Sequence, residues 1–259
     1  MDLGLGGKSA IVCASSRGLG FACAEALARE GVNVVINGRD PARLEAAAVR
    51  LRRLGSVRIE PVCANVTTQA GRSALLSACP EPDILVNNNA GPDPRDFMSI
   101  EGDDWIQALE ANMVAPLMLT RAVLPAMIAR RFGRILNITS AMVTTPRPHM
   151  TLSSGARAGL TAAMKGLSLD VARHNVTINN LLPERFDTDR QHDMALNMMK
   201  RLDIDYAEAR RRQIESIAAG RLGAPGEFGA TCAFLSSVHA GFISGQNIHL
   251  DGGSYPGLV

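Results

Sequence analysis

The sequence SAIVCASSRGLG, residues 9–20, joins a short apolar strand pattern to an amphipathic helix pattern. In a doubly wound α/β sheet, such a joint turns main-chain N–H groups and a helix N-terminus toward a pyrophosphate. Glycine suits the joint because the chain turns tightly and its main chain must come close to the phosphates. Two glycines are present, whereas an alanine occupies the place of a first one. The turn predicts a dinucleotide-binding loop made of Ala14, Ser15, Ser16, Arg17, Gly18, Leu19 and Gly20.

Short apolar strand patterns alternate with longer helix patterns along the rest of the chain. Asp40 and Pro41 supply an N-cap and a first-turn proline, and Gly31 and Gly55 supply C-terminal stops. The alternation is typical of repeated βαβ units, so we expect an α/β fold: a Rossmann-type, doubly wound parallel sheet in a three-layer α/β/α arrangement. The expected strands are residues 9–13, 32–37, 58–63, 83–87, 133–138, 177–181 and 247–250, and the expected helices are residues 18–29, 40–54, 69–77, 103–130, 153–173 and 226–236.

One domain spanning residues 1–259 is expected, because a hydrophobic content of 46% is enough for a full core. Residues 184–220 interrupt the alternation with an irregular, charged and methionine-rich pattern, in which Arg210, Arg211 and Arg212 are expected to lie on a solvated helix. A segment of this length beside a sheet edge is predicted to be a lid. Within it, Arg185, Arg190 and His192 could meet an acidic substrate or could simply be hydrated.

The composition excludes several classes of protein. Lys and Arg total 27 and Asp and Glu total 25, and the net charge of +2 does not provide the electrostatic field that nucleic-acid binding needs. Residues 1–9 have no apolar signal-peptide core and no apolar run reaches about 18 residues, so we expect a cytoplasmic protein without a membrane partner. The five cysteines include no CxxC pair and are expected to be reduced, mostly buried thiols. No residue pattern predicts a metal site.

The end of the second expected strand bears on the choice of cofactor. A protein that prefers NAD(H) usually has a carboxylate there to hold the ribose 2′-hydroxyl, whereas this chain has Asn37, Gly38 and Arg39. Arg17 and Arg39 could instead clamp a 2′-phosphate through charge-assisted hydrogen bonds, although both could also be hydrated surface side chains. The sequence therefore favours NADP(H) over NAD(H).

Further motifs follow the glycine turn in order along the chain. They are CANV at residues 63–66, DILVNN at 83–88, GRILNITS at 133–140, RLGAP at 221–225 and DGG at 251–253. With these motifs the chain resembles the short-chain dehydrogenase/reductase family over nearly its whole length, and most closely the 3-oxoacyl-[acyl-carrier-protein] reductase-like branch. The resemblance implies an oxidoreductase that interconverts a carbonyl and an alcohol, with a small carbonyl compound, an alcohol or an acyl thioester as substrate.

The resemblance also implies cofactor contacts and an assembly. The helices at residues 103–130 and 153–173 would form a dimer face, and the C-terminal strand would join a second interface to make a homotetramer. The implied cofactor residues are Asn65 and Val66 in the adenine pocket, Asn88 beside the ribose, and Pro183 and Thr188 in the nicotinamide-side loop.

Two departures from the family fall near the expected nicotinamide. The family's Asn-Asn-Ala-Gly becomes Asn87-Asn88-Asn89-Ala90, which displaces the glycine to Gly91. Glu184 follows Pro183 where glycine is usual. A carboxylate near the nicotinamide carboxamide or the phosphates is expected to weaken cofactor affinity.

The largest departure lies at the expected reaction centre. In the family a serine holds the carbonyl oxygen, a tyrosine transfers the proton, a lysine four residues later lowers the tyrosine pKa, and an asparagine supports a water relay. Asn112 and Ser140 match two of these places, but Ser153 stands at the tyrosine position and Arg157 at the lysine position. A serine hydroxyl is far less acidic than a phenol with a pKa of about 10. Arg157 stays protonated, so it can bind ribose hydroxyls or an oxyanion but cannot relay a proton.

Three functions are compatible with this centre. The first is an NADP(H)-dependent carbonyl reductase or alcohol dehydrogenase, in which Ser140 and Ser153 polarise the carbonyl and the proton comes from His149, Ser153, Tyr206 or water. The second is a redox-neutral, lyase-type reaction in which Arg157 and the serines stabilise an oxyanion. The third is a catalytically silent nucleotide-binding subunit. We favour the first because the other family motifs are retained.

Overall fold

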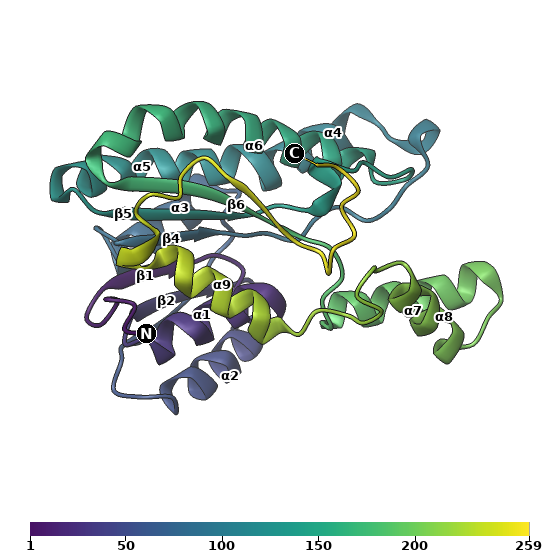
Figure 1. Cartoon of the computed structure of the whole chain (residues 1–259), viewed down its shortest axis with the longest axis horizontal. Helices are drawn as coiled ribbons and strands as arrows, with labels where there is room; N and C mark the ends of the chain where they lie inside the picture. The colour runs from purple at the N-terminus through teal and green to yellow at the C-terminus, as the bar shows by residue number, and fades with distance from the viewer. Residues whose placement is uncertain (259) are drawn as a thin grey trace.

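Seven parallel strands form one sheet in the computed structural model, which describes residues 1–258 (Figure 1). The strand order is β3-β2-β1-β4-β5-β6-β7, and every neighbouring pair runs parallel. The order reverses between β1 and β4, and in open α/β sheets ligands bind outside the carboxyl ends of the strands at such a reversal. The strands are β1 (Ser9–Val12), β2 (Asn33–Gly38), β3 (Ile59–Cys63), β4 (Ile84–Asn87), β5 (Gly133–Ile138), β6 (Val176–Pro183) and β7 (Asn247–Leu250).

Helices cover both faces of the sheet, so the predicted three-layer Rossmann-type fold is confirmed. On one face lie α1 (Gly18–Arg29), α2 (Pro41–Arg52) and α9 (Pro225–Ser236), whose buried side chains share one apolar core with the sheet. On the other face lie α3 (Gln69–Ala78), α5 (Ala115–Arg130) and α6 (Thr151–Val171), which share a second core. The helix starts follow local chemistry: Asp40 caps α2 by accepting a hydrogen bond from Arg43 N at 3.1 Å, and Pro41 is the first helical residue.

The helix predicted at residues 103–130 is one continuous path with a change of helix type inside it. α4 (Gly102–Leu109) passes into a π-helical turn, η2 (Glu110–Val114), and then into α5. By length and composition, residues 102–130 could also cross a membrane. Leu119, Val123 and Met127 of this segment are buried against the sheet, which accounts for its apolar character.

The predicted lid contains two helices, and the second includes Arg210, Arg211 and Arg212, for which a solvated helix is expected from the sequence. The helices are α7 (Asp189–Leu202) and α8 (Tyr206–Glu215), and Figure 1 shows them extending from the sheet beyond its carboxyl edge. The pair packs mainly on itself: Ala195 and Ala209 are fully buried, and Gln213 Nε2 donates to Gln191 O at 2.9 Å. The stripe of buried side chains is narrow and partly polar, so the usual apolar repeat of a core helix is missing.

A row of asparagines crosses four neighbouring strands, from the last residue of β4 through β5 and β6 to the first residue of β7. Asn87 Nδ2 donates to Asn137 Oδ1, Asn137 Nδ2 donates to Asn180 Oδ1, and Asn180 Nδ2 donates to Asn247 Oδ1, each at 2.9 Å. The four residues are direct partners in the strand register of β4, β5, β6 and β7. We call this row the asparagine ladder. A shift of one strand by one residue would turn its asparagine to the other face of the sheet, so the ladder favours a single register.

Asn137→Ala removes the central rung of the asparagine ladder. The variant leaves the buried Asn180 Oδ1 without its donor and takes one of two acceptors from Asn87 Nδ2, so we expect a loss of about 1–3 kcal/mol in the free energy of unfolding. Thermal unfolding should occur about 3–10 °C lower. Asn197→Ala, at an exposed position of α7, is the control and should change little. An Asn137→Ala protein as stable as the natural chain would show that the ladder does not stabilise the sheet.

Candidate cofactor and active site

The predicted phosphate loop, residues 14–20, ends at an open helix N-terminus. α1 begins at Gly18, and its N-cap residue, Arg17, makes no side-chain capping hydrogen bond. The first turn of α1, all of which the structure describes, carries no acidic side chain. Main-chain N–H groups without helical acceptors and the positive end of the helix dipole together bind anions. The loop therefore fits a pyrophosphate.

Gly20 allows the phosphate loop and the end of β4 to come together. A Cβ atom on Gly20 would lie 2.4 Å from Ala14 O and 2.7 Å from Asn88 Nδ2. Asn88 donates this amide to Ala14 O at 3.1 Å, and Ala14 adopts a left-handed φ of 44°. Ser15 ties the loop back to the first strand, because its Oγ donates to Val12 O at 2.7 Å. The structure thus brings Asn88, predicted to lie beside the ribose, against the phosphate loop.

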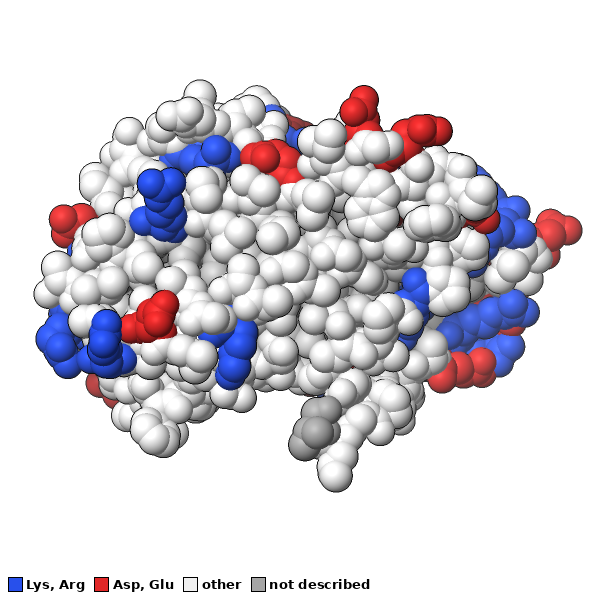
Figure 2. Space-filling view, turned by 90° about the horizontal axis from the view of Figure 1, so that it is seen from above, with Lys and Arg blue, Asp and Glu red and all other residues white. Residues whose placement is uncertain are grey.

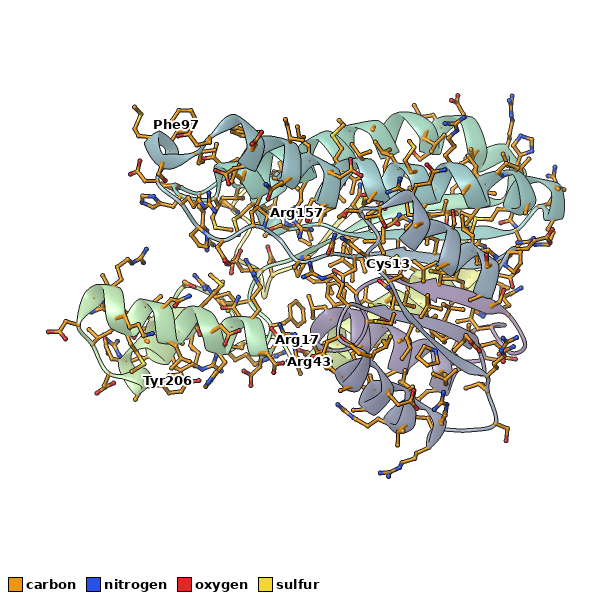
Figure 3. All side chains as sticks on the ribbon, turned by 180° about the vertical axis from the view of Figure 1, so that it is seen from behind. Cys13, Arg17, Arg43, Phe97, Arg157 and Tyr206 are labelled. Carbon is orange, nitrogen blue, oxygen red and sulfur yellow. The ribbon has the colours of Figure 1, made fainter. Side chains whose placement is uncertain are left out.

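Arginines surround the end of β2, where a 2′-phosphate is expected. The side chain of Asn37 hydrogen-bonds the main chain of the phosphate loop and of the β3 end, so it is used by the fold. Arg39 is exposed, and Arg17 makes an exposed ion pair with Asp189 of the lid at 3.2 Å. Figure 3 shows Arg43 in the same part of the molecule as Arg17. The sequence analysis missed Arg43 because it belongs to a helix rather than to a motif.

The two residues predicted for the adenine pocket follow β3 at the same edge of the sheet. Val66 is buried in the core beside α3, and Asn65 Oδ1 accepts a hydrogen bond from Thr67 N at 3.1 Å. Gly71 lets α3 begin against this turn, since a Cβ there would lie 1.9 Å from Asn65 O. Asn65 and Val66 therefore occupy a rigid position.

The start of the lid contacts both loops that border the cofactor site. The position of a Cβ on Gly18 would lie 4.0 Å from Thr188 Cγ2, so Thr188 lies against the phosphate loop. Arg190 Nη2 donates to Pro92 O at 3.3 Å on the loop that follows β4. Pro183, the last residue of β6, leads directly into this segment. The predicted nicotinamide-side residues Pro183 and Thr188 thus border the same site as the phosphate loop.

Asn112 lies in the π-helical turn η2 and is buried. Its Nδ2 donates to Ala108 O at 3.4 Å and to Ala90 O at 3.5 Å, and both contacts are long. Within residues 1–258, Asn112 Oδ1 is a buried oxygen without a hydrogen-bond donor. A π-helical turn is often found at functional sites, and a buried acceptor is costly to leave unpaired. Both features fit the predicted role of Asn112, which stays a prediction.

Ser140 and Ser153 come from the two ends of the segment between β5 and α6. Ser140 follows the carboxyl end of β5, and its Oγ accepts a hydrogen bond from Met142 N at 3.2 Å. Ser153 lies in the first turn of α6, and both side chains are buried. Gly91 lies next to Ser153: a Cβ on Gly91 would be 3.7 Å from Ser153 Oγ. The displaced glycine therefore borders the expected reaction centre.

Arg157 is a buried cation held by main-chain carbonyls. Its Nη1 donates to Ile138 O at 2.7 Å and to Thr139 O at 3.0 Å, and its Nη2 donates to Asn89 O at 3.3 Å. Within residues 1–258 the guanidinium forms no ion pair with an acidic side chain. Burial, and secondarily the charge of Arg190, lower the pKa of Arg157 to about 10. Arg157 therefore stays protonated at neutral pH.

Gly91 also provides the space that Arg157 occupies. A Cβ on Gly91 would lie 3.2 Å from Arg157 Nη2, closer than most real contacts allow. Figure 3 shows Arg157 in the middle of the molecule, between the two helical layers. Arg157, Ser153 and Gly91 thus form one cluster at the carboxyl edge of the sheet.

The two alternative proton donors lie farther from this cluster. His149 is exposed and adopts a left-handed φ of 64°, and its main-chain O accepts a hydrogen bond from Arg95 N at 2.9 Å. Tyr206 lies at the far end of the lid from Arg157 in Figure 3 and hydrogen-bonds His192 Nδ1 at 2.7 Å. Neither side chain meets Ser153 in this conformation.

Glu184, the carboxylate expected to weaken cofactor affinity, is buried and paired with arginines. Its side chain is only 5% exposed, and Glu184 Oε1 lies 2.9 Å from Arg147 Nη2 and 3.7 Å from Arg185 Nε. Two guanidinium groups offset its charge, so the simple expectation of repulsion toward a cofactor phosphate does not follow. The sequence analysis missed Arg147, which carries no motif.

The family can now be identified. A model of the short chain dehydrogenase family matches residues 8–198, most of the segment that contains these features. The chain belongs to the short-chain dehydrogenase/reductase family. As a short-chain dehydrogenase it is an oxidoreductase enzyme, and its relatives support the carbonyl–alcohol class of reaction.

Relatives of this short-chain dehydrogenase match it over almost the full length. The 3-oxoacyl-[acyl-carrier-protein] reductase FabG of Vibrio cholerae is 32% identical over 257 residues, which are 98% of this chain and 99% of that protein. The structure of L-sorbose reductase from Gluconobacter frateurii, complexed with NADPH and L-sorbose, has a TM-score of 0.94 at 28% identity and covers all of both chains. A 3-oxoacyl (acyl-carrier-protein) reductase from Agrobacterium tumefaciens with NADP bound has a TM-score of 0.87 at 29% identity, covering 97% of this chain and 96% of that one.

Arg157→Lys tests the hydrogen bonds that hold the reaction centre. Two nitrogens of the Arg157 guanidinium donate to three main-chain carbonyls. The single ammonium group of a lysine cannot reach all three, so at least one buried carbonyl loses its donor. We expect the free energy of unfolding, measured by urea denaturation without cofactor, to fall by about 1–3 kcal/mol. Arg53→Lys, at an exposed position after α2, is the matched control. Equal stability of Arg157→Lys and the natural chain would contradict this account.

Proposed function

We propose that this short-chain dehydrogenase is an NADP(H)-dependent oxidoreductase that interconverts a carbonyl and an alcohol, with Ser153 and Arg157 acting in place of the family tyrosine and lysine. The observation that carries the proposal is the cluster of Arg157, Ser153 and Gly91. It places a buried positive charge and a hydroxyl at the carboxyl edge of the sheet, where the open N-terminus of α1 also lies.

NADP(H) is favoured over NAD(H) by the charges at the end of β2. Asn37 and Gly38 offer no carboxylate there, Asp40 is used to cap α2, and the exposed Arg39, together with Arg17, would receive a 2′-phosphate. Two structural relatives contain NADPH or NADP, which supports the same choice. The phosphate loop would hold the pyrophosphate, and Asn88 and Arg157 would lie toward the ribose. When bound, the nicotinamide supplies or accepts a hydride.

The residues of the chain then act mainly through electrostatics. During reduction, negative charge develops on the carbonyl oxygen, and preorganised donors in a site shielded from water stabilise that charge. Ser140 and Ser153 would donate hydrogen bonds to the oxygen, while the charge of Arg157 stabilises it from behind Ser153. Arg157 keeps its proton, so the alcohol proton would come from water or from His149 after a movement of its loop. Tyr206 is a weaker candidate because His192 already binds its hydroxyl.

We also propose a broad substrate class and a homotetrameric assembly. Relatives named as 3-oxoacyl reductases and a sorbose reductase indicate a small carbonyl compound or an acyl thioester. Figure 2 shows that the face over α5 and α6 has few charged side chains, and Leu169 of α6 is 71% exposed there. This face suits the dimer contact of the predicted homotetramer. The cytoplasmic location also stays a prediction.

The observations support the reductase more than the redox-neutral or the catalytically silent alternative. The relatives reported above are reductases, and two of them are structures that contain the cofactor. The open N-terminus of α1 and the paired charge of Glu184 leave the cofactor site usable. No observed contact favours an elimination over hydride transfer.

Titration with NADPH and NADH, followed by nicotinamide fluorescence, tests the cofactor assignment. We expect the natural chain to bind NADPH at least about tenfold more tightly than NADH, because a charged hydrogen-bonded contact to a phosphate contributes about 1.5–3 kcal/mol. Arg39→Ala should weaken NADPH binding by about the same factor and leave NADH binding unchanged. Arg53→Ala is the control. Similar affinity for both cofactors in the natural chain would refute the preference for NADP(H).

Ser153→Ala tests the proposed hydroxyl. Loss of one preorganised donor to the developing oxyanion should lower kcat for NADPH-dependent carbonyl reduction by about 10²-fold, with unchanged NADPH affinity. Ser154→Ala, one residue along the same helix, is the matched control. Full turnover by Ser153→Ala would exclude the role. An unchanged pH–rate profile in His149→Gln would assign the proton to water instead of His149.

A further inference from the structure

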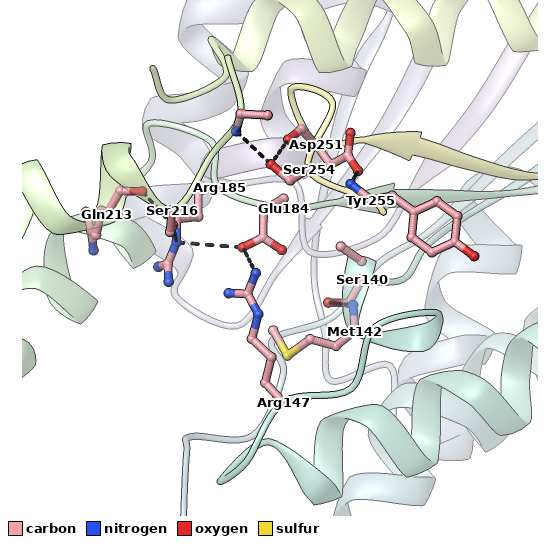
Figure 4. Close-up of polar contacts among 12 residues, drawn as sticks. Ser140, Met142, Arg147, Glu184, Arg185, Gln213, Ser216, Asp251, Ser254 and Tyr255 are labelled. Atoms are coloured by element: carbon pink, nitrogen blue, oxygen red, sulfur yellow. Dashed lines mark hydrogen bonds and ion pairs between the residues drawn. The ribbon is translucent and has the colours of Figure 1, made fainter. Parts of the chain in front are cut away.

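Glu184 places a buried carboxylate where the family usually has no side chain. It follows the last residue of β6, and its main-chain N donates to Leu250 O at 3.1 Å, which fixes its position against β7. Within residues 1–258 its carboxylate accepts no hydrogen bond that meets ordinary geometry, and its polar partners are the two arginines. In Figure 4, Glu184 lies between Arg147 and Arg185 on one side and Ser140 on the other.

The two arginines beside Glu184 differ in how they are held. Arg185 is part of the fold: its Nε donates to Ser216 Oγ at 3.0 Å and its Nη1 donates to Gln191 Oε1 at 3.2 Å. Arg147 comes from the segment between β5 and α6, its side chain is 36% exposed, and within residues 1–258 Glu184 is its only ionic partner. Arg147 therefore keeps donors for a further acceptor, and Glu184 keeps an acceptor for a further donor.

Figure 4 shows these groups beside Ser140, so the body of a substrate whose carbonyl is held by Ser140 would extend toward them. Ser140 is expected to hold the carbonyl oxygen, and the segment that follows it carries Met142, Thr144 and Arg147. Thr144 Oγ1 lies 3.4 Å from His249 Nε2 of β7, so the polar surface continues to the end of the sheet. We call the surface formed by Arg147, Glu184, Thr144 and His249 the polar wall. It offers both hydrogen-bond donors and hydrogen-bond acceptors, and Met142 lies beside it.

Three kinds of carbonyl compound would interact differently with the polar wall. An apolar acyl chain would cover the charged pair without replacing its hydrogen bonds to water, which is unfavourable. A carboxylate would gain from Arg147 but would have to approach the carboxylate of Glu184. A hydroxyl group both donates and accepts, so neighbouring hydroxyls can satisfy Glu184 and Arg147 together.

We propose that the Arg147–Glu184 pair selects carbonyl substrates that carry hydroxyl groups next to the carbonyl, that is, hydroxylated ketones. The inference rests on the proposed reductase function. Glu184 accepts a hydrogen bond from one substrate hydroxyl, Arg147 donates to another, and the carbonyl is left facing Ser140.

The test compares four carbonyl substrates in NADPH oxidation by the full chain, three of which have the same four-carbon skeleton. They are erythrulose, 2-butanone, 2-oxobutanoate and the acetoacetyl thioester of N-acetylcysteamine, which supply hydroxyls, no polar group, a carboxylate and an acyl thioester. We expect kcat/KM for erythrulose to exceed that for each of the others by at least about tenfold, the effect of one hydrogen bond to a charged group. Higher kcat/KM for any of the other three overturns the inference.

Glu184→Gln and Arg147→Met assign the preference to the pair. Each variant should raise KM for erythrulose by about tenfold or more with a much smaller change in kcat, since the contact is made to the body of the substrate. Glu45→Gln, which removes an exposed carboxylate paired with Arg52 on α2, is the matched control and should keep the natural KM. Glu184→Gly, with the residue that is usual in the family, serves if Glu184→Gln does not fold. An unchanged preference for erythrulose in these variants overturns the inference.

A binding measurement separates this inference from the proposed function. If no carbonyl is reduced, the proposed reductase function fails, but erythrulose can still be titrated into the complex of the protein with NADPH while nicotinamide fluorescence is followed. Saturable binding of erythrulose that is lost in Glu184→Gln supports the pair as a hydroxyl-binding site. Absence of that binding, or equal binding by Glu184→Gln, overturns it.

Discussion

The asparagine ladder is the constraint on which the active site depends. Its amide hydrogen bonds fix the register of β4, β5, β6 and β7, and Asn88, Ser140 and Glu184 follow the carboxyl ends of the first three of these strands. Asn88 directly follows the rung at Asn87, and Ser140 follows Asn137 by one short segment. A slip of one residue would turn an asparagine amide into an apolar core and move these residues to different depths. The geometry of the site is therefore tied to buried amides outside it.

The sequence predicted most of the fold because its signals are local. A glycine turn, apolar strand runs, an N-cap before a proline and a glycine after a helix each act within a few residues, and the observed strands and helices follow them closely. The ladder could not be predicted in this way, because its partners are separated by 50, 43 and 67 residues. The hydrogen-bond partner of a polar residue inside an apolar strand cannot be predicted until the neighbouring strands are known. Of the two lid helices, only a solvated helix around Arg210 was expected, and α7 was missed for a related reason, since it packs on α8 through a narrow, partly polar stripe.

In the candidate site, too, the features with a local sequence motif could be predicted and the contacts between distant residues could not. The phosphate loop and Asn88 were predictable because the motif and its geometry coincide, but the contacts of Arg157 were not. Its three acceptors are main-chain carbonyls, which no sequence pattern reveals. These carbonyls explain how an arginine can stand at a buried position with no acid beside it, while Gly91 supplies the room. A guanidinium bound in this way keeps its charge, so in the proposed function the centre would offer electrostatic stabilisation in place of the proton transfer that a tyrosine and a lysine provide.

Glu184 shows how the sheet fixes the position of a side chain that the family usually lacks. On a mobile loop, a carboxylate and two arginines would move into water, and their interaction would contribute little. Glu184 instead follows β6, the strand whose Asn180 bonds both neighbours in the asparagine ladder, and its main chain continues the pairing to β7. The carboxylate is thereby kept buried beside Arg147 at a cost that only suitable hydrogen-bonding partners offset. The same register that aligns Asn88 and Ser140 also holds this charged pair in place, so in the proposed mode of substrate binding the polarity around the substrate would follow from the sheet itself.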